Sequence, residues 1–277
     1  MKYFSMFTGI GGFEKGIEDA KTNWECVGYS EIDKYANAIY RYHYPNTKNY
    51  GDATRIVPNE LPDFDCIVGG FPCQPFSISG NRHGFKDTRG TLFFDILRIA
   101  RIKRPGYLWL ENVKGLLNHK QGNTFQIIIE SLDELGYCIQ WQVLDSQCHQ
   151  VPQHRERVFI ICHFRDLPPP KIFPITESYG LDYAVPTISG GYRKRRGEDG
   201  AFIKISENKI RWLTINEIEV LQGFPKDWTK YGLFDNGEVK EISDAQRYKC
   251  CGNAVTTNVI KDIAVKWSSS TTDLPYI

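Results

Sequence analysis

The sequence predicts an α/β fold: a mostly parallel sheet with helices on both faces, an antiparallel pair at one edge, and a small, loop-rich second lobe. Over residues 1–165, short apolar runs alternate with amphipathic segments at the spacing typical of parallel βαβ units. Residues 137–163 contain two consecutive strand patterns with no room for a crossover helix, which predicts the antiparallel pair. A proline-rich segment at residues 167–170 then ends the alternation.

Each expected element follows from its own pattern. Strands are predicted for the apolar runs at residues 3–7, 25–30, 66–69, 107–110, 139–144 and 158–163. Helices are predicted for the amphipathic stretches at residues 13–20, 34–42, 92–102 and 124–135. Residues 171–212 are glycine-rich and basic, without helical periodicity, and predict the loop-rich lobe. Two more helices are predicted at residues 213–223, with Thr214 and Glu217 at capping-box spacing, and at residues 253–267.

The composition excludes several classes of protein. With 41% hydrophobic and 24% charged residues among 277, the chain is globular rather than mainly disordered or collagen-like. Lys and Arg number 34 against 33 Asp and Glu, so the chain is not a polycationic nucleic-acid coat, although a local basic face stays open. No apolar stretch approaches the roughly 20 residues of a membrane-spanning helix, and the N-terminus lacks a signal-peptide pattern. We expect a cytoplasmic monomer that does not contact a membrane.

The eight cysteines lie mostly within apolar runs, which indicates reduced, buried thiols rather than a disulfide framework. Zinc needs ligands clustered at spacings of about two to four residues, and the chain offers only adjacent Cys-His and Cys-Cys neighbours, so we predict no metal site. Cys73 differs from the others, because it lies in a loop of glycines and prolines, GGFPCQPFS at residues 69–77. A thiol exposed there can ionise and act as a nucleophile; the alternative is an inert thiol.

A glycine-rich turn at residues 7–12, FTGIGG, follows the first predicted strand and opens a helix. Its glycines permit a tight turn and a close approach of backbone to ligand. The spacing differs from the dinucleotide pattern G-x-G-x-x-G, and an ordinary strand-to-helix turn is the alternative. Glu31, 19 residues after Gly12, stands where an acidic side chain meets the ribose hydroxyls of a bound nucleotide. Together these features favour an adenosine-containing cofactor.

Two further motifs place charged groups at strand ends. Glu111 leaves the apolar strand YLWLENV, where poor solvation raises a carboxyl pKa and allows proton delivery; a capping or ion-paired acid is the alternative. Arg155 and Arg157, in QHRER, are two residues apart on a predicted strand and therefore share a face suited to the oxygens of a polar ligand. A solvated charge run is the alternative there.

Taken in order, FTGIGG, SEID, GGFPCQPFS, ENV, QHRER, LTINEIEVLQGFP and GNAV resemble the motifs of the DNA (cytosine-5) methyltransferase family, of the bacterial or phage restriction-modification type, over nearly the whole chain. The resemblance implies a Rossmann-like, S-adenosylmethionine-dependent methyltransferase sheet. Residues 1–166 would be the catalytic and cofactor-binding domain and 167–212 a short target-recognition lobe. Residues 213–277 would return to the catalytic domain, with the last helix packing on it. The implied substrate is double-stranded DNA, and a restriction endonuclease acting on the same site is a candidate partner.

The resemblance also implies roles for individual residues. By motif match, S-adenosyl-L-methionine would be bound by Phe7, Gly9, Gly11, Gly12, Glu31, Ile32, Asp52, Asn253 and Val255, the last two from the final helix. Cys73 would attack carbon 6 of a flipped cytosine, Glu111 would neutralise charge on ring nitrogen 3, and Arg157 would hold the carbonyl oxygen. Arg155 would steady the loop that carries Cys73. Phosphates of the DNA would be bound by Arg82, Arg193, Lys194, Arg195 and Arg196.

The motifs leave two alternative functions. Cytosine-5 methylation of tRNA would use the same chemistry, but the extra aromatic-threonine sequence after ENV in that branch is absent here. A catalytically idle DNA-binding regulator would carry damage at Cys73, Glu111 or Arg157, and all three are intact. Ser5 stands where many members carry an acid, although serine also occurs there. The stretch between QHRER and LTINE is shorter than is usual in the family, which predicts a short recognition site or a partner that supplies part of the recognition.

Overall fold

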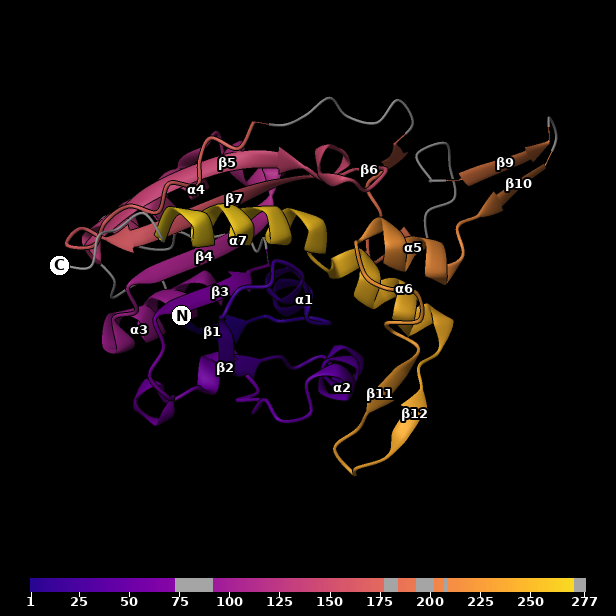
Figure 1. Cartoon of the computed structure of the whole chain (residues 1–277), viewed down its shortest axis with the longest axis horizontal. Coiled ribbons are helices and arrows are strands. Elements are labelled where there is room, and N and C mark those ends of the chain that lie inside the picture. The colour runs from indigo at the N-terminus through magenta and orange to yellow at the C-terminus, as the bar shows by residue number, and fades with distance from the viewer. Residues whose placement is uncertain (73–91, 177–183, 193–201, 207–208, 272–277) are drawn as a thin grey trace.

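The computed structural model describes residues 1–72, 92–176, 184–192, 202–206 and 209–271. At its centre is a six-stranded sheet in the order β2-β1-β3-β4-β7-β5 (Figure 1). The strands are β1 (Lys2–Met6), β2 (Glu25–Ser30), β3 (Cys66–Gly70), β4 (Tyr107–Val113), β5 (Tyr137–Asp145) and β7 (Glu156–Phe164). β1 runs parallel to β2 and β3, and β3 parallel to β4, whereas β7 is antiparallel to both of its neighbours, β4 and β5. The predicted mostly parallel sheet with an antiparallel edge is confirmed.

Helices cover both faces of the sheet, because successive side chains of each strand point to opposite sides. On one face lie α1 (Gly12–Asp19) and α7 (Thr257–Thr271), and on the other lie α3 (Leu92–Lys103) and α4 (Asn123–Glu134) (Figure 1). In β4, Trp109 packs into the core beneath α1 and α7, whereas Leu108 and Leu110 pack beneath α3 and α4. Burial of both faces explains why the strands consist of nearly continuous apolar runs.

A second hydrophobic core lies beside the sheet, on the right in Figure 1. It joins α2 (Lys34–His43) to α5 (Ile215–Leu221) and α6 (Asp244–Asn253), and Ile10 from the glycine-rich turn is fully buried in it. Short two-stranded pairs are formed by β6 (Gln153–His154) with β8 (Val185–Pro186), β9 (Phe202–Ser206) with β10 (Lys209–Trp212), and β11 (Tyr231–Leu233) with β12 (Val239–Glu241). The glycine-rich turn is therefore packed from outside the sheet by elements from the C-terminal part of the chain.

The two helix predictions near the C-terminus have different outcomes. α5 begins after Thr214, whose hydroxyl accepts from the N–H of Glu217 while the Glu217 carboxylate accepts from the N–H of Thr214, so the capping box is confirmed. The helix predicted at residues 253–267 is present but begins later, because α6 ends at Asn253 and α7 runs from Thr257 to Thr271. Ala254 is extended, at φ −70° and ψ 152°, and its carbonyl oxygen accepts from Arg155 at 2.8 Å instead of continuing a helix.

Within the described part of the chain, no helix has both the length and the apolar character needed to cross a bilayer.

Candidate active site

The carboxyl ends of four parallel strands converge on one pocket. The strand register places Met6 of β1 beside Ser30 of β2 and Gly69 of β3, and Gly70 of β3 beside Glu111 of β4. A pocket of about 560 Å³ opens at this edge, a size that suits a small-molecule ligand. The predicted site residues that line it are Phe7, Gly9, Glu31, Ile32, Asp52, Glu111, Arg155, Arg157 and Asn253. Residues expected to bind a cofactor and residues expected to act on a substrate therefore share one cavity.

The glycine-rich turn between β1 and α1 adopts a conformation that few side chains tolerate. The backbone φ is +55° at Phe7, +61° at Gly9 and +86° at Gly11, all in the left-handed region. A Cβ on Gly9 would meet no atom within 4 Å, because that face of the turn is open toward the pocket. The N–H of Gly9 donates to Oε2 of Glu31 at 2.7 Å, which ties the turn to the end of β2.

Glu31 is held by three backbone N–H groups. Oε2 accepts from Gly9, and Oε1 accepts from Ile32 at 2.9 Å and from Asp33 at 2.7 Å. Burial raises the pKa of Glu31, and these three donors oppose that rise. Oε1 already accepts two hydrogen bonds and Oε2 only one, so Oε2 can still accept from a hydroxyl of a ribose.

Ile32 and Asp52 also line the pocket, close to Glu31. Ile32 is 73% exposed, an unusually bare aliphatic side chain against which a flat heterocycle can pack. Asp52 accepts from the N–H of Thr54 at 2.9 Å and from its hydroxyl at 2.8 Å, and these hydrogen bonds hold the pKa of Asp52 below its ordinary value. An ionised, oriented carboxylate is a suitable acceptor for a ligand amine.

Gly11, Gly12 and Val255, which the motif match places at the cofactor, are not among the residues that line the pocket. A Cβ on Gly12 would lie 2.6 Å from Cγ1 of Val255, and a Cβ on Gly11 would lie 3.0 Å from the ring of Tyr44. In the structure these residues let the start of α1 pack closely against α2 and against the segment before α7. Their direct contact with a cofactor stays a prediction.

Glu111 and Arg157 form an ion pair at the other end of the pocket. They lie near one another because Val113 and Arg157 are paired across β4 and β7, and Nε of Arg157 is 3.1 Å from Oε1 of Glu111. The Glu111 side chain is only 12% exposed. Burial raises the pKa of Glu111, and the guanidinium groups of Arg157 and Arg155 partly oppose the rise. The Glu111 carboxyl can therefore take up a proton when a ligand accepts hydrogen bonds from Arg157 and weakens the ion pair.

Arg155 lines the same pocket but is bonded to the surrounding backbone. It is 3% exposed, and its guanidinium donates to the carbonyl oxygens of Ile188 and Ala254, each at 2.8 Å. Burial, with the nearby charge of Arg157, lowers the pKa of Arg155 to about 9. Arg155 thus joins the lobe segment at Ile188 to the junction between α6 and α7. Both arginines line one pocket, although Arg155 lies between β6 and β7, so the two do not share the strand predicted for them.

The loop that leads to Cys73 is anchored to β4. Asn112 is buried, and its side-chain amide donates to the carbonyl oxygen of Phe71 at 2.8 Å. Phe71 and Pro72 line the pocket immediately before Cys73. Cys73 itself lies outside the described residues, as do Arg82, Arg193, Lys194, Arg195 and Arg196.

Several pocket residues escaped sequence reasoning. Lys249 of α6 and Asp33, the N-cap of α2, form an ion pair at 2.6 Å, and both line the pocket. Ser189 and Gly190 line it from the segment after β8, where the backbone passes so close to α6 that a Cβ on Gly252 would lie 2.2 Å from the carbonyl carbon of Ser189. The glycine in GNAV is a signal for such a crossing, whereas no local pattern indicates Lys249.

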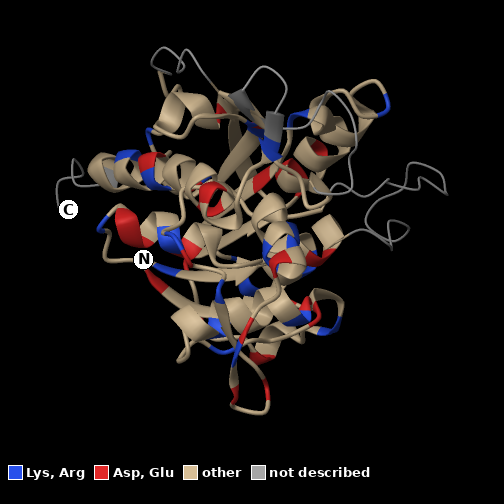
Figure 2. Cartoon of the chain, turned by 90° about the vertical axis from the view of Figure 1, so that its right-hand side faces the viewer, with Lys and Arg blue, Asp and Glu red and all other residues tan. Residues whose placement is uncertain are grey.

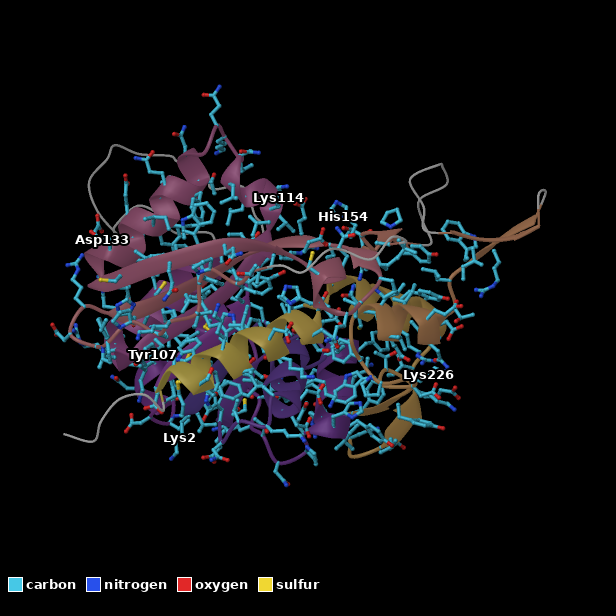
Figure 3. All side chains as sticks on the ribbon, turned by 45° about the horizontal axis from the view of Figure 1, so that its top comes forward. Lys2, Tyr107, Lys114, Asp133, His154 and Lys226 are labelled. Atoms are coloured by element: carbon cyan, nitrogen blue, oxygen red, sulfur yellow. The ribbon has the colours of Figure 1, made fainter. Side chains whose placement is uncertain are left out.

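Charge is mixed over the described surface. In the view of Figure 2, basic and acidic residues are interspersed rather than gathered by sign. Near the pocket, Lys114 follows β4 and pairs with Glu156 at 2.6 Å, and the exposed His154 pairs with Asp145; the two labelled side chains lie near each other in Figure 3. Among the described residues, no three His, Cys, Asp or Glu side chains are grouped so that they could hold a metal ion.

Comparison with known proteins identifies the family. The model of the C-5 cytosine-specific DNA methylases matches residues 1–180 and 175–269. The chain is 36% identical to the type II methyltransferase M.NlaX of Neisseria lactamica, covering 95% of both chains. It is 35% identical to the type II methyltransferase M.BsuFI of Bacillus subtilis, covering 95% of this chain and 71% of the relative.

Solved structures agree at the level of the fold. The Dnmt2 methyltransferase of S. pombe superposes with a TM-score of 0.77 at 17% identity, covering 99% of this chain and 100% of that one. A DNMT2 variant of Spodoptera frugiperda gives a TM-score of 0.75 at 19% identity, over 96% and 99% of the two chains. The sheet, the pocket at its carboxyl edge and a family match over nearly all of its length together show that this chain belongs to the C-5 cytosine-specific DNA methylase family.

Proposed function

We propose that the protein methylates carbon 5 of a cytosine that is flipped out of double-stranded DNA into the pocket described above. The catalytic residues would be Cys73, Glu111 and Arg157. The observation that carries the proposal is that the Glu111–Arg157 pair lines the same cavity as Gly9, Glu31 and Ile32. A cytosine base held by the Glu111–Arg157 pair would lie against a cofactor held by Gly9, Glu31 and Ile32. Transfer of a methyl group from cofactor to base requires this proximity.

As a member of its family, the chain is a DNA (cytosine-5) methyltransferase that uses S-adenosyl-L-methionine. When bound, this cofactor supplies an electrophilic methyl group on a sulfonium. The described residues fit it: Glu31 offers a fixed acceptor for the ribose, Ile32 a bare apolar surface for the adenine, and Asp52 an acceptor for its amine.

The chain's own residues make carbon 5 reactive. The Cys73 thiolate would form a bond to carbon 6 of the cytosine, and the electron pair of the 5,6 double bond would move toward carbon 5. Glu111 would place its proton on ring nitrogen 3, which neutralises the charge that develops in the ring, while Arg157 would donate to the carbonyl oxygen. After methylation, the proton on carbon 5 would pass to solvent water, and its bonding electron pair would restore the 5,6 double bond. The bond between Sγ and carbon 6 would then break to release the Cys73 thiolate, and the proton on ring nitrogen 3 would return to Glu111.

The polar neighbours of these groups hold them in place. Asn112 of β4 fixes the carbonyl of Phe71, two residues before Cys73 in the sequence, and β4 also carries Glu111. Arg155 fixes the backbone of Ile188 and Ala254 around the same cavity. The nucleophile, the acid and the cofactor turn would thus all be anchored to the same sheet, which keeps their relative positions fixed.

We propose that residues 167–212, together with Arg82, contact the DNA. Arg82 and the run Arg193, Lys194, Arg195 and Arg196 would bind phosphates, which supports unstacking of the target base. We further propose a cytoplasmic monomer of bacterial or phage type that acts beside a restriction endonuclease of the same specificity. The assignment to a restriction-modification system is supported by the type II names of its relatives in Bacillus subtilis and Neisseria lactamica.

Bisulfite sequencing of DNA and tRNA from a host without cytosine-5 methylation, expressing the chain, tests the function. The expected result is protection of cytosines within one short DNA sequence and none in tRNA. The Cys73→Ser variant, expressed at the same level, is the control and should give no protection. Protection of tRNA alone would replace DNA as the substrate, and no protection in either nucleic acid by a folded protein would refute the proposed activity.

A further inference from the structure

The side of the glycine-rich turn that faces away from the pocket is bonded to Trp228. Trp228 follows α5 in the sequence, and its indole Nε1 donates to the carbonyl oxygen of Ile10 at 3.0 Å. Neither residue lines the pocket. The two are 218 positions apart in the chain, so this hydrogen bond joins the cofactor turn to the second hydrophobic core.

The indole of Trp228 is itself fixed in position. Its ring stacks on the imidazole of His43 at the end of α2, with ring centroids 3.5 Å apart and an interplanar angle of 2°. A ring nitrogen of His43, Nε2, lies 2.7 Å from the carbonyl oxygen of Trp228. Trp228 is 8% exposed, so the hydrogen bond to Ile10 is shielded from water.

One buried carboxylate holds the backbone on both sides of Trp228. Oε2 of Glu219 accepts from the N–H of Asp227 at 2.7 Å, and Oε1 accepts from the N–H of Thr229 at 2.8 Å. Arg247 of α6 lies 3.1 Å from Oε1 and balances the charge of this fully buried acid. The turn that carries Trp228 is therefore tied to α5 and α6, and it can act as a rigid support for whatever the indole contacts.

The turn that receives this hydrogen bond needs outside support. Phe7, Gly9 and Gly11 all have positive φ, and Phe7 has a side chain that disfavours such a conformation. On the pocket side the turn is held by the bond from Gly9 to Glu31, and on the far side by the bond from Trp228 to Ile10. These two bonds hold adjacent residues from opposite directions.

We infer that Trp228 is a positioning residue for S-adenosylmethionine binding: by holding the carbonyl of Ile10, it keeps the glycine-rich turn in the conformation that lines the cofactor end of the pocket. Without the indole N–H, the turn would spend part of its time in other conformations. The apparent dissociation constant rises in inverse proportion to the fraction of molecules in the competent state. The inference rests on the proposed placement of the cofactor in this pocket.

Calorimetric titration with S-adenosylhomocysteine tests the inference without depending on catalysis. Replacing the Trp228 indole by a benzothiophene, through incorporation of the sulfur analogue of tryptophan, keeps the ring and its stacking but removes the N–H donor. Trp228→Phe is the simpler companion variant. Loss of one buried hydrogen bond predicts a dissociation constant about fivefold higher for the benzothiophene variant. At saturating cofactor, kcat and the KM for DNA should stay within about twofold of wild type, since the groups at the base are untouched.

Trp267→Phe is the matched control. Trp267 is a fully buried tryptophan of α7 that packs against Trp24 and Tyr107 at the far end of the sheet, away from the pocket. This variant should lose stability while binding S-adenosylhomocysteine within about twofold of wild type. Equal affinity of the wild type and the benzothiophene variant would overturn the role of Trp228 alone. Equal weakening in Trp267→Phe would also overturn it, whereas failure of the wild type to bind would overturn the pocket assignment as well.

Discussion

Gly70 and Glu111 lie opposite each other at the ends of β3 and β4, and a Cβ on Gly70 would stand 2.9 Å from Oε2 of Glu111. The absence of a side chain at Gly70 thus makes the space that the Glu111 carboxyl occupies beside Arg157. Glycine ordinarily weakens a strand, but at position 70 it leaves the room that the Glu111 carboxyl needs.

We predict that Gly70→Ala lowers kcat by about tenfold or more, because the added methyl group displaces the Glu111 carboxyl and small misplacements of a reacting group are costly. S-adenosylhomocysteine affinity, measured by calorimetry, should change less than kcat. Gly115→Ala is the control, since a Cβ at Gly115 would meet no atom within 4 Å. Unchanged kcat in Gly70→Ala would show that Glu111 tolerates the shift.

Cys73→Ser should abolish methyl transfer while folding and cofactor binding persist. A serine hydroxyl is hardly ionised near neutral pH, whereas a thiol in a favourable site is. Methyl transfer from labelled S-adenosylmethionine and calorimetry on the same preparation separate the two effects. Turnover within about tenfold of wild type would contradict the covalent mechanism.

Glu111→Gln should slow the chemical step more than it weakens DNA binding, because a proton is required only when charge develops on the ring. The amide keeps the size of the side chain but cannot deliver that proton. Single-turnover rates at saturating DNA, set beside dissociation constants for the same duplex, measure the two quantities. A loss confined to DNA affinity would assign Glu111 to binding alone.

Glu14, in the first turn of α1, predicts a pH dependence of stability. Burial raises the pKa of Glu14 from 4.5 to about 7, and Sγ of Cys26 lies 3.9 Å from Oε1. Because the folded-state pKa lies above the unfolded value, the stabilising contribution is complete below pH 4.5 and is lost as the pH rises to about 7. Within that window, the free energy of unfolding should fall by up to about 1.4 kcal/mol per pH unit from this group.

Denaturant unfolding of wild type and Glu14→Gln across this window measures the contribution as a difference between the two proteins. Glu14→Gln should be more stable than wild type at pH 8 relative to pH 5, because its amide cannot ionise. Parallel pH profiles for the two proteins would show that Glu14 titrates normally.

The basic run at Arg193, Lys194, Arg195 and Arg196 predicts salt-sensitive, sequence-independent affinity. Replacing all four by alanine should weaken binding about equally for cognate and mismatched duplexes. The slope of log affinity against log salt should also become shallower by about 0.9 for each phosphate that the variant no longer neutralises. Equal affinity and an equal slope in wild type and variant would show that the run is a solvated surface.

The short second lobe predicts a short recognition sequence. Each bidentate contact to a base supplies roughly 1–3 kcal/mol of discrimination, so a lobe with few such contacts is limited to a site of about four base pairs or fewer. Methylation mapped over a random-sequence library measures the site directly. A strict site of six or more base pairs would show that specificity is built elsewhere.

Local sequence pattern was sufficient to predict the sheet and part of the pocket. The strands were predicted correctly because both faces are buried, and Glu31 and Glu111 could be found because each directly follows or ends an apolar run. The residues from the C-terminal part were harder to predict. Asn253 and Val255 lie at a break between helices that is made by Arg155, which captures the carbonyl of Ala254 from far along the chain. Lys249 pairs with Asp33 over a longer span, 216 positions, and local periodicity does not indicate such contacts.

The pocket is built from residues that lie far apart in the sequence. The pairs Lys249–Asp33 and Trp228–Ile10 span 216 and 218 positions, whereas every strand of the central sheet lies before residue 165. On a ribosome that adds about 5–20 residues per second, the sheet strands therefore emerge several seconds before the last wall of the pocket. A nascent chain that stops short of Lys249 contains every strand of the central sheet but lacks Lys249, Cys250, Gly252 and Asn253 of the pocket wall. The sheet is thus synthesised before the pocket at its edge can be completed.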